Sequence, residues 1–152
     1  MKDMVIYLGA DHRGFELKNK LRIYATSIGY EVADLGAATL LPDDDYTDYA
    51  RAVAKKISLD SVNSRGILLC GSGGGMAIAA NRFPNVRANL ALSPDQVYAS
   101  RHDDDANILV IAADFTDENA AAGMVKVFLT TPFGTDARYR RRVAKIDEAP
   151  NI

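Results

Sequence analysis

Residues 66–76 read Gly66-Ile67-Leu68-Leu69-Cys70-Gly71-Ser72-Gly73-Gly74-Gly75-Met76, an apolar run that ends at the single cysteine of the chain and continues as a glycine-rich turn. Residues 76–83 then have the composition of a helix. Where a strand breaks at glycine into a helix, backbone N–H groups point at one spot, with the positive end of the helix dipole behind them. The stretch therefore predicts an α/β unit with an anion-binding turn beside a thiol.

Cys70 has two interpretations from this pattern alone. The field of such a turn favours the thiolate form of a nearby thiol, which would make Cys70 a base or nucleophile. Free cysteine is also among the most buried residue types, and glycine-rich strand-to-helix turns are common in α/β proteins. The glycines fit neither the dinucleotide fingerprint, which fails at Met76 or at Ile78, nor the phosphate loop, which needs a Gly-Lys pair. A nucleotide site is therefore disfavoured.

Length, charge and cysteine content bound the class of protein. The chain has 152 residues, of which 48% are hydrophobic and 25% charged, the mix of one globular domain spanning residues 1–152. Its net charge of −2 gives no general argument for a nucleic-acid partner. One cysteine excludes an internal disulfide and fits a reducing compartment. Because no apolar run suits a secretory signal or a membrane span, we expect a cytoplasmic protein without a membrane partner.

Short apolar runs alternate with helical patterns along the chain. Strands are expected at residues 4–8, 30–34, 66–70, 87–92 and 108–112. Helices are expected at residues 15–28, 46–57, 76–83, 116–129 and 136–147, and a further helix is expected to start at residue 94 and to end within residues 101–105. This alternation is typical of a parallel sheet with helices on both faces. We therefore predict a three-layer α/β/α sandwich around a five-stranded parallel, Rossmann-like sheet, with an extra basic helix at the C-terminus.

Polar side chains flank three of the predicted strands, and ligands of parallel sheets bind at the carboxyl ends of the strands. The residues expected at those ends are Asp11 and His12, Cys70 and Ser72, and Asn107 with Asp114. A histidine in this position can hold a phosphate or move a proton. The alternative is an aspartate that caps the following helix and a histidine on the surface.

The densest basic cluster is Arg138-Tyr139-Arg140-Arg141-Arg142. Arg138 and Arg142 are four residues apart and share one face of the predicted helix, where two guanidinium groups make a phosphate clamp. On spacing alone, a solvated charged face is the favoured interpretation. The rest of the chain lacks the wider basic surface that nucleic-acid binding requires.

Two acidic runs, Asp43-Asp44-Asp45 and Asp103-Asp104-Asp105, raise the question of a divalent metal. Neither run has the spacing of a calcium-binding loop, and the chain has no pair of histidines or cysteines at zinc-binding spacing. Acidic runs are more often solvated loops or helix caps. We therefore expect no metal site.

Four motifs, taken jointly and in order, resemble the type B ribose-5-phosphate isomerase family, which also contains the galactose-6-phosphate isomerase subunits. The motifs lie at residues 9–18, 45–50, 66–82 and 138–143, and the resemblance extends from Val5 to Ile146. It implies aldose–ketose isomerisation of a sugar phosphate through a cis-enediolate, without metal or cofactor, with D-ribose 5-phosphate and D-ribulose 5-phosphate as the expected pair. The alternatives are another pentose or hexose phosphate, or a sugar-phosphate-binding protein that has lost turnover.

The resemblance also implies roles for individual residues. Cys70 would be the base that moves a proton between C2 and C1, and Ser72 with the loop N–H groups would hold the developing oxyanion. The substrate-binding residues implied are Asp11, His12, Tyr46, Gly71, Gly73, Gly74, Gly75, Asn107, Arg138 and Arg142. Of these, His12 and the two arginines would hold the phosphate, and Asp11 and Tyr46 the sugar hydroxyls. Family members are dimers or tetramers with active sites shared between subunits, so a homodimer or homotetramer is expected.

The chain departs from the family pattern at two positions. The ring-opening histidine of the family usually lies four residues before the asparagine that is Asn107 here, and Asp103 occupies that position. His102 lies one residue earlier, a rotation of about 100° on a helix. The family also often has a phosphate-binding arginine where this chain has Asp114, so the charge there is reversed.

Three routes for ring opening remain: Asp103 acts itself, His102 reaches in from an unwound helix end, or the ring opens in solution. We expect Asp103 to act, because a helix fixes its direction and the neighbouring acids oppose its ionisation. Asp103→Ala should then slow turnover of a ring-forming sugar phosphate more than His102→Ala does, and a substrate that cannot cyclise should be less affected. Steady-state kinetics of both variants check this, and a larger loss in His102→Ala would reverse the assignment.

Overall fold

The computed structural model describes residues 3–148 and 150, and strands alternate with helices through this range. The strands are β1 (Val5–Ala10), β2 (Glu31–Asp34), β3 (Ser64–Cys70), β4 (Ala88–Ala91) and β5 (Ile108–Ala112). The helices are α1 (Phe15–Ser27), α2 (Tyr46–Leu59), α3 (Gly74–Ala80), α4 (Pro94–Asp104), α5 (Glu118–Thr130) and α6 (Ala137–Asp147), with a 3₁₀ turn, η1 (Ala113–Phe115), after β5. The predicted order of elements is confirmed.

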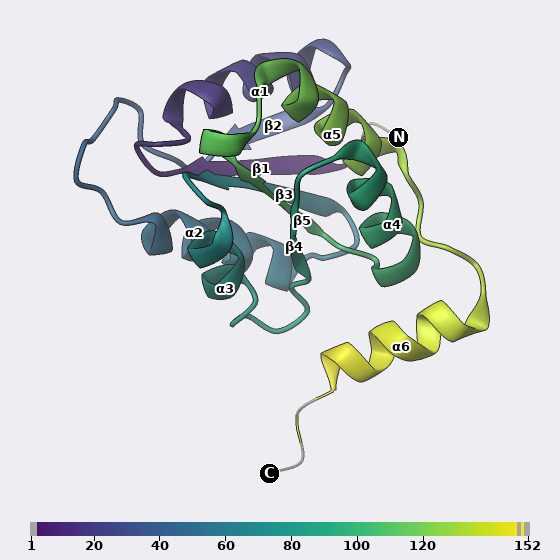
Figure 1. The fold of residues 1–152 in the computed structure, drawn as a ribbon. Coiled ribbons are helices and arrows are strands. Elements are labelled where there is room, and N and C mark those ends of the chain that lie inside the picture. Colours follow the sequence, from purple (N-terminus) through teal and green to yellow (C-terminus); the bar gives the residue numbers. More distant parts are fainter. Residues whose placement is uncertain (1–2, 149, 151–152) are drawn as a thin grey trace.

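All five strands are parallel and lie in the order β2-β1-β3-β5-β4. Helices α1, α4 and α5 cover one face of the sheet, while α2 and α3 cover the other (Figure 1). The predicted three-layer sandwich is therefore confirmed. Every strand ends at the same edge of a parallel sheet, so the turns after β1, β3 and β5 share one edge, which we call the carboxyl edge.

Two hydrophobic cores lie on the two faces of the sheet. Consecutive side chains alternate between them: Leu69 packs with α1 and α5, whereas Leu68 packs with α2 and α3. Both side chains are completely buried. This burial on both faces explains why the central strands are unbroken apolar runs and not alternating ones.

Helix α4 ends at Asp104, within the run 101–105 where its end was expected, whereas α3 ends earlier than predicted. The buried Arg101 donates to Asp105 Oδ1 (2.8 Å) and to the carbonyl of Ala106 (2.7 Å), which holds the last turn of α4. Helix α3 ends at Ala80 instead of residue 83. The next residue, Asn81, pairs through its side-chain amide with both the N–H and the C=O of Ala88 (2.8 and 2.9 Å).

Helix α6 does not belong to the sandwich. It follows an extended linker and stands away from the sheet, beside the end of α4 (Figure 1). Val143 is its one buried residue in the described range, and the arginines that precede it in the helix are exposed. The linker is held by a hydrogen bond from Gly134 N to the carbonyl of His102 (2.9 Å), and the helix end by an ion pair between Asp147 and Arg87 (3.0 Å).

The close packing of α1 on β3 can be tested with a pair of glycine substitutions. A Cβ on Gly14 would lie 2.7 Å from Cβ of Leu69, and 3.0 Å from its carbonyl carbon, so Gly14→Ala should lower the free energy of unfolding by about 2 kcal/mol. Gly123, inside α5, has its nearest neighbour at 3.8 Å. Gly123→Ala should therefore raise stability by about 0.5–1 kcal/mol through helix propensity. Denaturant unfolding of both variants measures the difference, and equal effects would contradict the predicted contact.

Candidate active site

The predicted site residues fall into two groups at opposite edges of the sheet. The carboxyl-edge group is Asp11, His12, Tyr46, Cys70, Gly71, Ser72, Gly73, Gly74 and Gly75. The amino-edge group is His102, Asp103 and Asn107, with Arg138 and Arg142 on α6. Cys70 pairs with Ala112 at the end of β5, whereas Asn107 precedes that strand, so at about 3.3 Å per residue Asn107 lies about 16 Å from Cys70 along the strand direction.

Cys70 is the last residue of β3 and is 5% exposed. Its Sγ accepts a hydrogen bond from the backbone N–H of Gly73 (3.1 Å). Gly73 has a φ of 80°, and a Cβ there would lie 2.5 Å from Cδ1 of Leu90. Glycine is thus required at this position for both backbone conformation and space, and the sulfur is held against the turn.

The turn after Cys70 leads into α3, whose first N–H groups have no partner within the helix. Ser72 is exposed at this turn. The ring of Tyr46, the first residue of α2, lies on Gly75, where a Cβ would come within 2.7 Å of the Tyr46 hydroxyl oxygen. The structure therefore brings together the thiol, the serine, the glycine turn and the phenol, as the resemblance implied.

Asp11 is buried, and its Oδ1 accepts from the N–H groups of Arg13 (3.0 Å) and Gly14 (3.3 Å). One carboxylate oxygen thus fixes the turn that leads into α1. The hydrogen bonds within the described chain use only Oδ1, so the second oxygen is available for a ligand.

Asp44 is a site residue that the sequence pattern did not identify, because an acidic run is typical of a solvated loop. Its Oδ1 accepts from the backbone N–H of His12 (2.9 Å) and lies 2.8 Å from His12 Nδ1. Burial acts to raise the pKa of Asp44, but hydrogen bonds from His12 and Tyr49 outweigh burial and lower it. Burial and the bond to Asp44 raise the pKa of Tyr49 to about 12. His12 is thereby oriented through Nδ1, which leaves Nε2 as the nitrogen for a ligand.

Arg13 is a second residue that the sequence reasoning did not single out. Its Nη2 forms an ion pair with Asp114, on η1, and its guanidinium occupies the space above Gly71 that a side chain would otherwise fill. The backbone N–H of Asp114 also donates to the carbonyl of Gly71 (3.1 Å). The reversed charge at Asp114 is therefore matched by an arginine from the other side of the turn.

The expectation that Asn107 lies at the carboxyl edge is wrong, because Asn107 precedes β5. Its buried amide accepts from the N–H of Arg87 (2.8 Å) and donates to the carbonyl of Asn85 (2.7 Å). These bonds close the loop before β4, so within one chain Asn107 is a structural residue.

His102 and Asp103 do not point apart as the one-residue rotation suggested. His102 Nδ1 lies 2.7 Å from Asp103 Oδ1, because two side chains at the end of a helix can bend toward each other. The imidazole stacks on Tyr98 (5.5 Å between centroids) and meets the edge of Tyr139 on α6 (5.3 Å). Burial and the Asp103 carboxylate raise the pKa of Asp104, against the effect of Arg142. The end of α4 and the basic face of α6 thus form one polar surface.

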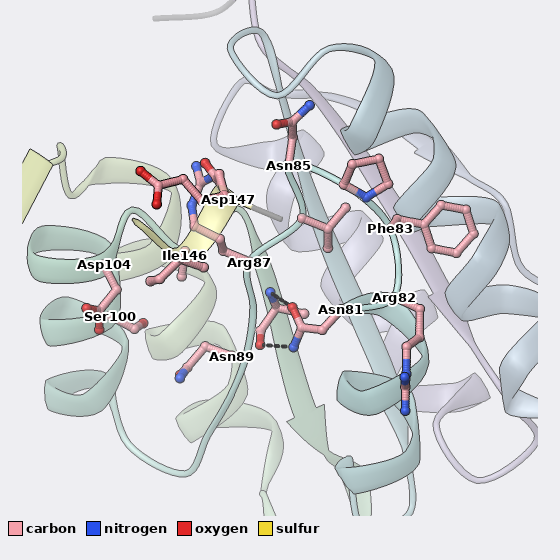
Figure 2. A pocket seen from close by; sticks show the side chains of 15 residues that line it. Asn81, Arg82, Phe83, Asn85, Arg87, Asn89, Ser100, Asp104, Ile146 and Asp147 are labelled. Atoms are coloured by element: carbon pink, nitrogen blue, oxygen red, sulfur yellow. Dashed lines mark hydrogen bonds and ion pairs between the residues drawn. The ribbon is translucent and has the colours of Figure 1, made fainter. Parts of the chain in front are cut away.

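A hollow of about 790 Å³ lies at the amino edge, between the loop of residues 81–89, the end of α4 and the end of α6 (Figure 2). In Figure 2 the side chains of Arg87, Ile146 and Asp147 lie around this space, where the end of α6 approaches the loop. Neither Cys70 nor the turn that follows it lines this hollow, so the hollow and the thiol are separate sites.

Within residues 3–148 and 150, no three His, Cys, Asp or Glu side chains gather as a metal-binding group. The expectation of a metal-free site stays a prediction. In the same range, no helix combines the length and apolar character needed to cross a membrane.

Comparison with known proteins relates this geometry to one family. Residues 6–146 match the family model described as Ribose/Galactose Isomerase. The chain is 37% identical over 143 residues to ribose-5-phosphate isomerase B of Mycobacterium tuberculosis strain H37Rv, covering 94% of this chain and 88% of the relative. It is similar to the solved structure of ribose-5-phosphate isomerase B from Mycoplasma genitalium with bound ribulose-5-phosphate (TM-score 0.93, 33% identity, 97% and 96% coverage). It also resembles the Thermotoga maritima ribose 5-phosphate isomerase structure (TM-score 0.89, 42% identity, 96% and 99% coverage).

The hydrogen-bonded contact between His12 and Asp44 leads to a prediction about acid stability. The pKa of Asp44 is lowered in the folded state, so its stabilising effect is present above the ordinary value of 3.8 and is lost as pH falls through the lower folded pKa. Asp44→Asn should therefore flatten the loss of stability that the protein shows between about pH 5 and pH 2. Asp43→Asn, at the exposed neighbouring carboxylate, is the control. Urea unfolding across this pH range should separate the two variants, and parallel curves would contradict the assigned contact.

Proposed function

Because the chain belongs to the ribose/galactose isomerase family, we propose that it interconverts D-ribose 5-phosphate and D-ribulose 5-phosphate without a metal or cofactor. The observation that carries the proposal is the thiol of Cys70, buried at the end of β3 with its sulfur against the N–H of Gly73. The relative from Mycoplasma genitalium, whose structure holds ribulose-5-phosphate, supports the choice of substrate.

The chemistry requires one base and one oxyanion site. The Cys70 thiolate removes the C2 proton of the open-chain aldose, and the electron pair moves through the new C1–C2 double bond onto the carbonyl oxygen O1. Ser72 and the N–H groups of the turn stabilise the negative charge of this cis-enediolate. The Cys70 thiol then returns its proton to C1 while the proton of O2 passes to O1, which gives the ketose. No atom is gained or lost in the sum of these steps.

Side chains around the turn would bind the rest of the substrate. The second oxygen of Asp11 and the hydroxyl of Tyr46 accept or donate hydrogen bonds to the sugar hydroxyls. His12, oriented by Asp44 through Nδ1, presents Nε2 to the phosphate. The reaction needs a reduced thiol, which suits the cytoplasm, where we expect the enzyme to act.

We propose that a second copy of the chain completes each site. Asn107 of the amino-edge group is about 16 Å from Cys70 along the strands of its own chain, and α6 extends away from the sandwich (Figure 1). Exposed apolar side chains along α3, β4, α4 and η1 support an interface with another subunit: Ile78, Leu90, Leu92, Tyr98 and Phe115. In a symmetric dimer, Arg138 and Arg142 of one subunit would reach the phosphate held at the carboxyl edge of the other.

The same arrangement would bring His102 and Asp103 to the substrate of the partner. Their 2.7 Å contact makes them a coupled pair, in which Asp103 orients the ring or exchanges a proton with it. This supports ring opening at the enzyme over ring opening in solution. Isomerisation of another pentose or hexose phosphate is the second candidate function, and a panel of sugar phosphates decides between them.

Cys70→Ala and Cys70→Ser should each lose at least about 100-fold in turnover, the usual scale for a general base. Coupled assays of ribose 5-phosphate conversion measure the loss, with circular dichroism to show that the variants fold. Near-normal turnover in a folded Cys70→Ala protein would rule out the role.

A mixture of variants tests the shared site. Cys70→Ala and Arg142→Ala should each be weak alone, but co-refolded chains should recover about a quarter of wild-type activity, since half of random dimers are mixed and one site in each is intact. If each site lies within one chain, co-refolding of the two variants should restore no activity.

A further inference from the structure

Arg13 lies at the carboxyl edge, beside the glycine turn that follows Cys70. It occupies the turn after β1, its side chain is 54% exposed, and its guanidinium covers Gly71, the residue after Cys70. Asp114 approaches from the opposite side of the same glycine and pairs with Nη2 of Arg13. The turn after β3 is thus bordered by Arg13 near its start and by Tyr46 at Gly75.

The ion pair uses only part of the guanidinium. An arginine carries five N–H donors in a fixed plane, and Asp114 engages Nη2. Among the described residues, Nε and Nη1 of Arg13 have no hydrogen-bond acceptor assigned, and they lie against Gly71. Two donor groups are therefore oriented by the pair with Asp114 and remain available for an anion.

The carboxyl edge carries several negative charges, so a cationic donor is needed there to bind an anionic substrate. The turns after β1, β3 and β5 carry three carboxylates in the described chain, Asp11, Asp114 and Asp117, and Asp44 lies against His12. The imidazole of His12 is committed to Asp44 through Nδ1. Arg13 is then the permanent positive charge that these turns offer to a dianionic substrate.

We infer that Arg13 binds the phosphate of the substrate and that Asp114 is the positioning residue that holds its guanidinium over Gly71. This inference deepens the proposed function and rests on it for the identity of the substrate. It adds Arg13 to His12 as a phosphate-binding residue of the same chain, besides the arginines that a second copy would supply. Asp114 without Arg13 would repel the phosphate, so the two residues act as a unit.

The test compares Arg13→Gln, Asp114→Asn and the double variant, with Arg22→Gln as control, because Arg22 is an exposed arginine farther along α1. Calorimetry measures the affinity for inorganic phosphate, and kinetics give kcat and KM for ribose 5-phosphate. Arg13→Gln should weaken phosphate binding and raise KM by about tenfold with little change in kcat, the scale of one charge-assisted hydrogen bond. The double variant should bind phosphate better than Arg13→Gln, since the uncompensated carboxylate is gone. Arg22→Gln should behave as wild type.

Unchanged phosphate affinity in folded Arg13→Gln would overturn the inference while leaving the proposed function intact. A changed pH profile of Cys70 alkylation with unchanged phosphate affinity would also overturn it, since Arg13 would then act on the thiol. If the wild type isomerises no sugar phosphate but binds inorganic phosphate through Arg13, the proposed function fails and the inference stands.

Discussion

The central strand β3 pairs with β1 on one side and with β5 on the other, and its residues 67–69 are completely buried between two layers of helices. From Gly66 to Leu69 both faces of this strand are covered by helices and both of its edges are paired. Cys70 is its last residue, and the N–H of Gly73 meets the sulfur immediately beyond. The position of the thiol is thus fixed by the pairing of the sheet, and the turns that surround it follow from the lengths of β1 and β5.

The fold could be predicted from the sequence because each strand is a short apolar run and each turn contains glycine or a capping residue. Turn positions at one edge of the sheet predicted Asp11, Cys70 and Ser72, and the family resemblance added Tyr46. Asp114 was also expected at this edge, but its ion pair with Arg13 was not, and Asp44 was expected in a solvated loop. The contacts of Asp44 with His12 and of Asp114 with Arg13 are long-range, and no local pattern contains them.

The error over Asn107 has a different origin. The residue is next to β5 in the sequence, but a parallel sheet has two edges, and a position before a strand lies at the edge opposite to a position after it. The same rule explains why α4, which runs back across the sheet, carries His102 and Asp103 away from the thiol. A linear motif therefore combines residues from both edges, and a single copy of this chain does not bring them together.

Helix α6 has a consequence for how the protein becomes active. It places its arginines outside the body of its own chain, with one residue of the described helix buried. If a second copy completes each site, as proposed above, an isolated chain would lack part of its site, and activity would rise with the square of the chain concentration until dimers saturate. Activity would then depend on assembly, and a substitution on α6 of one chain would affect catalysis at the thiol of the other.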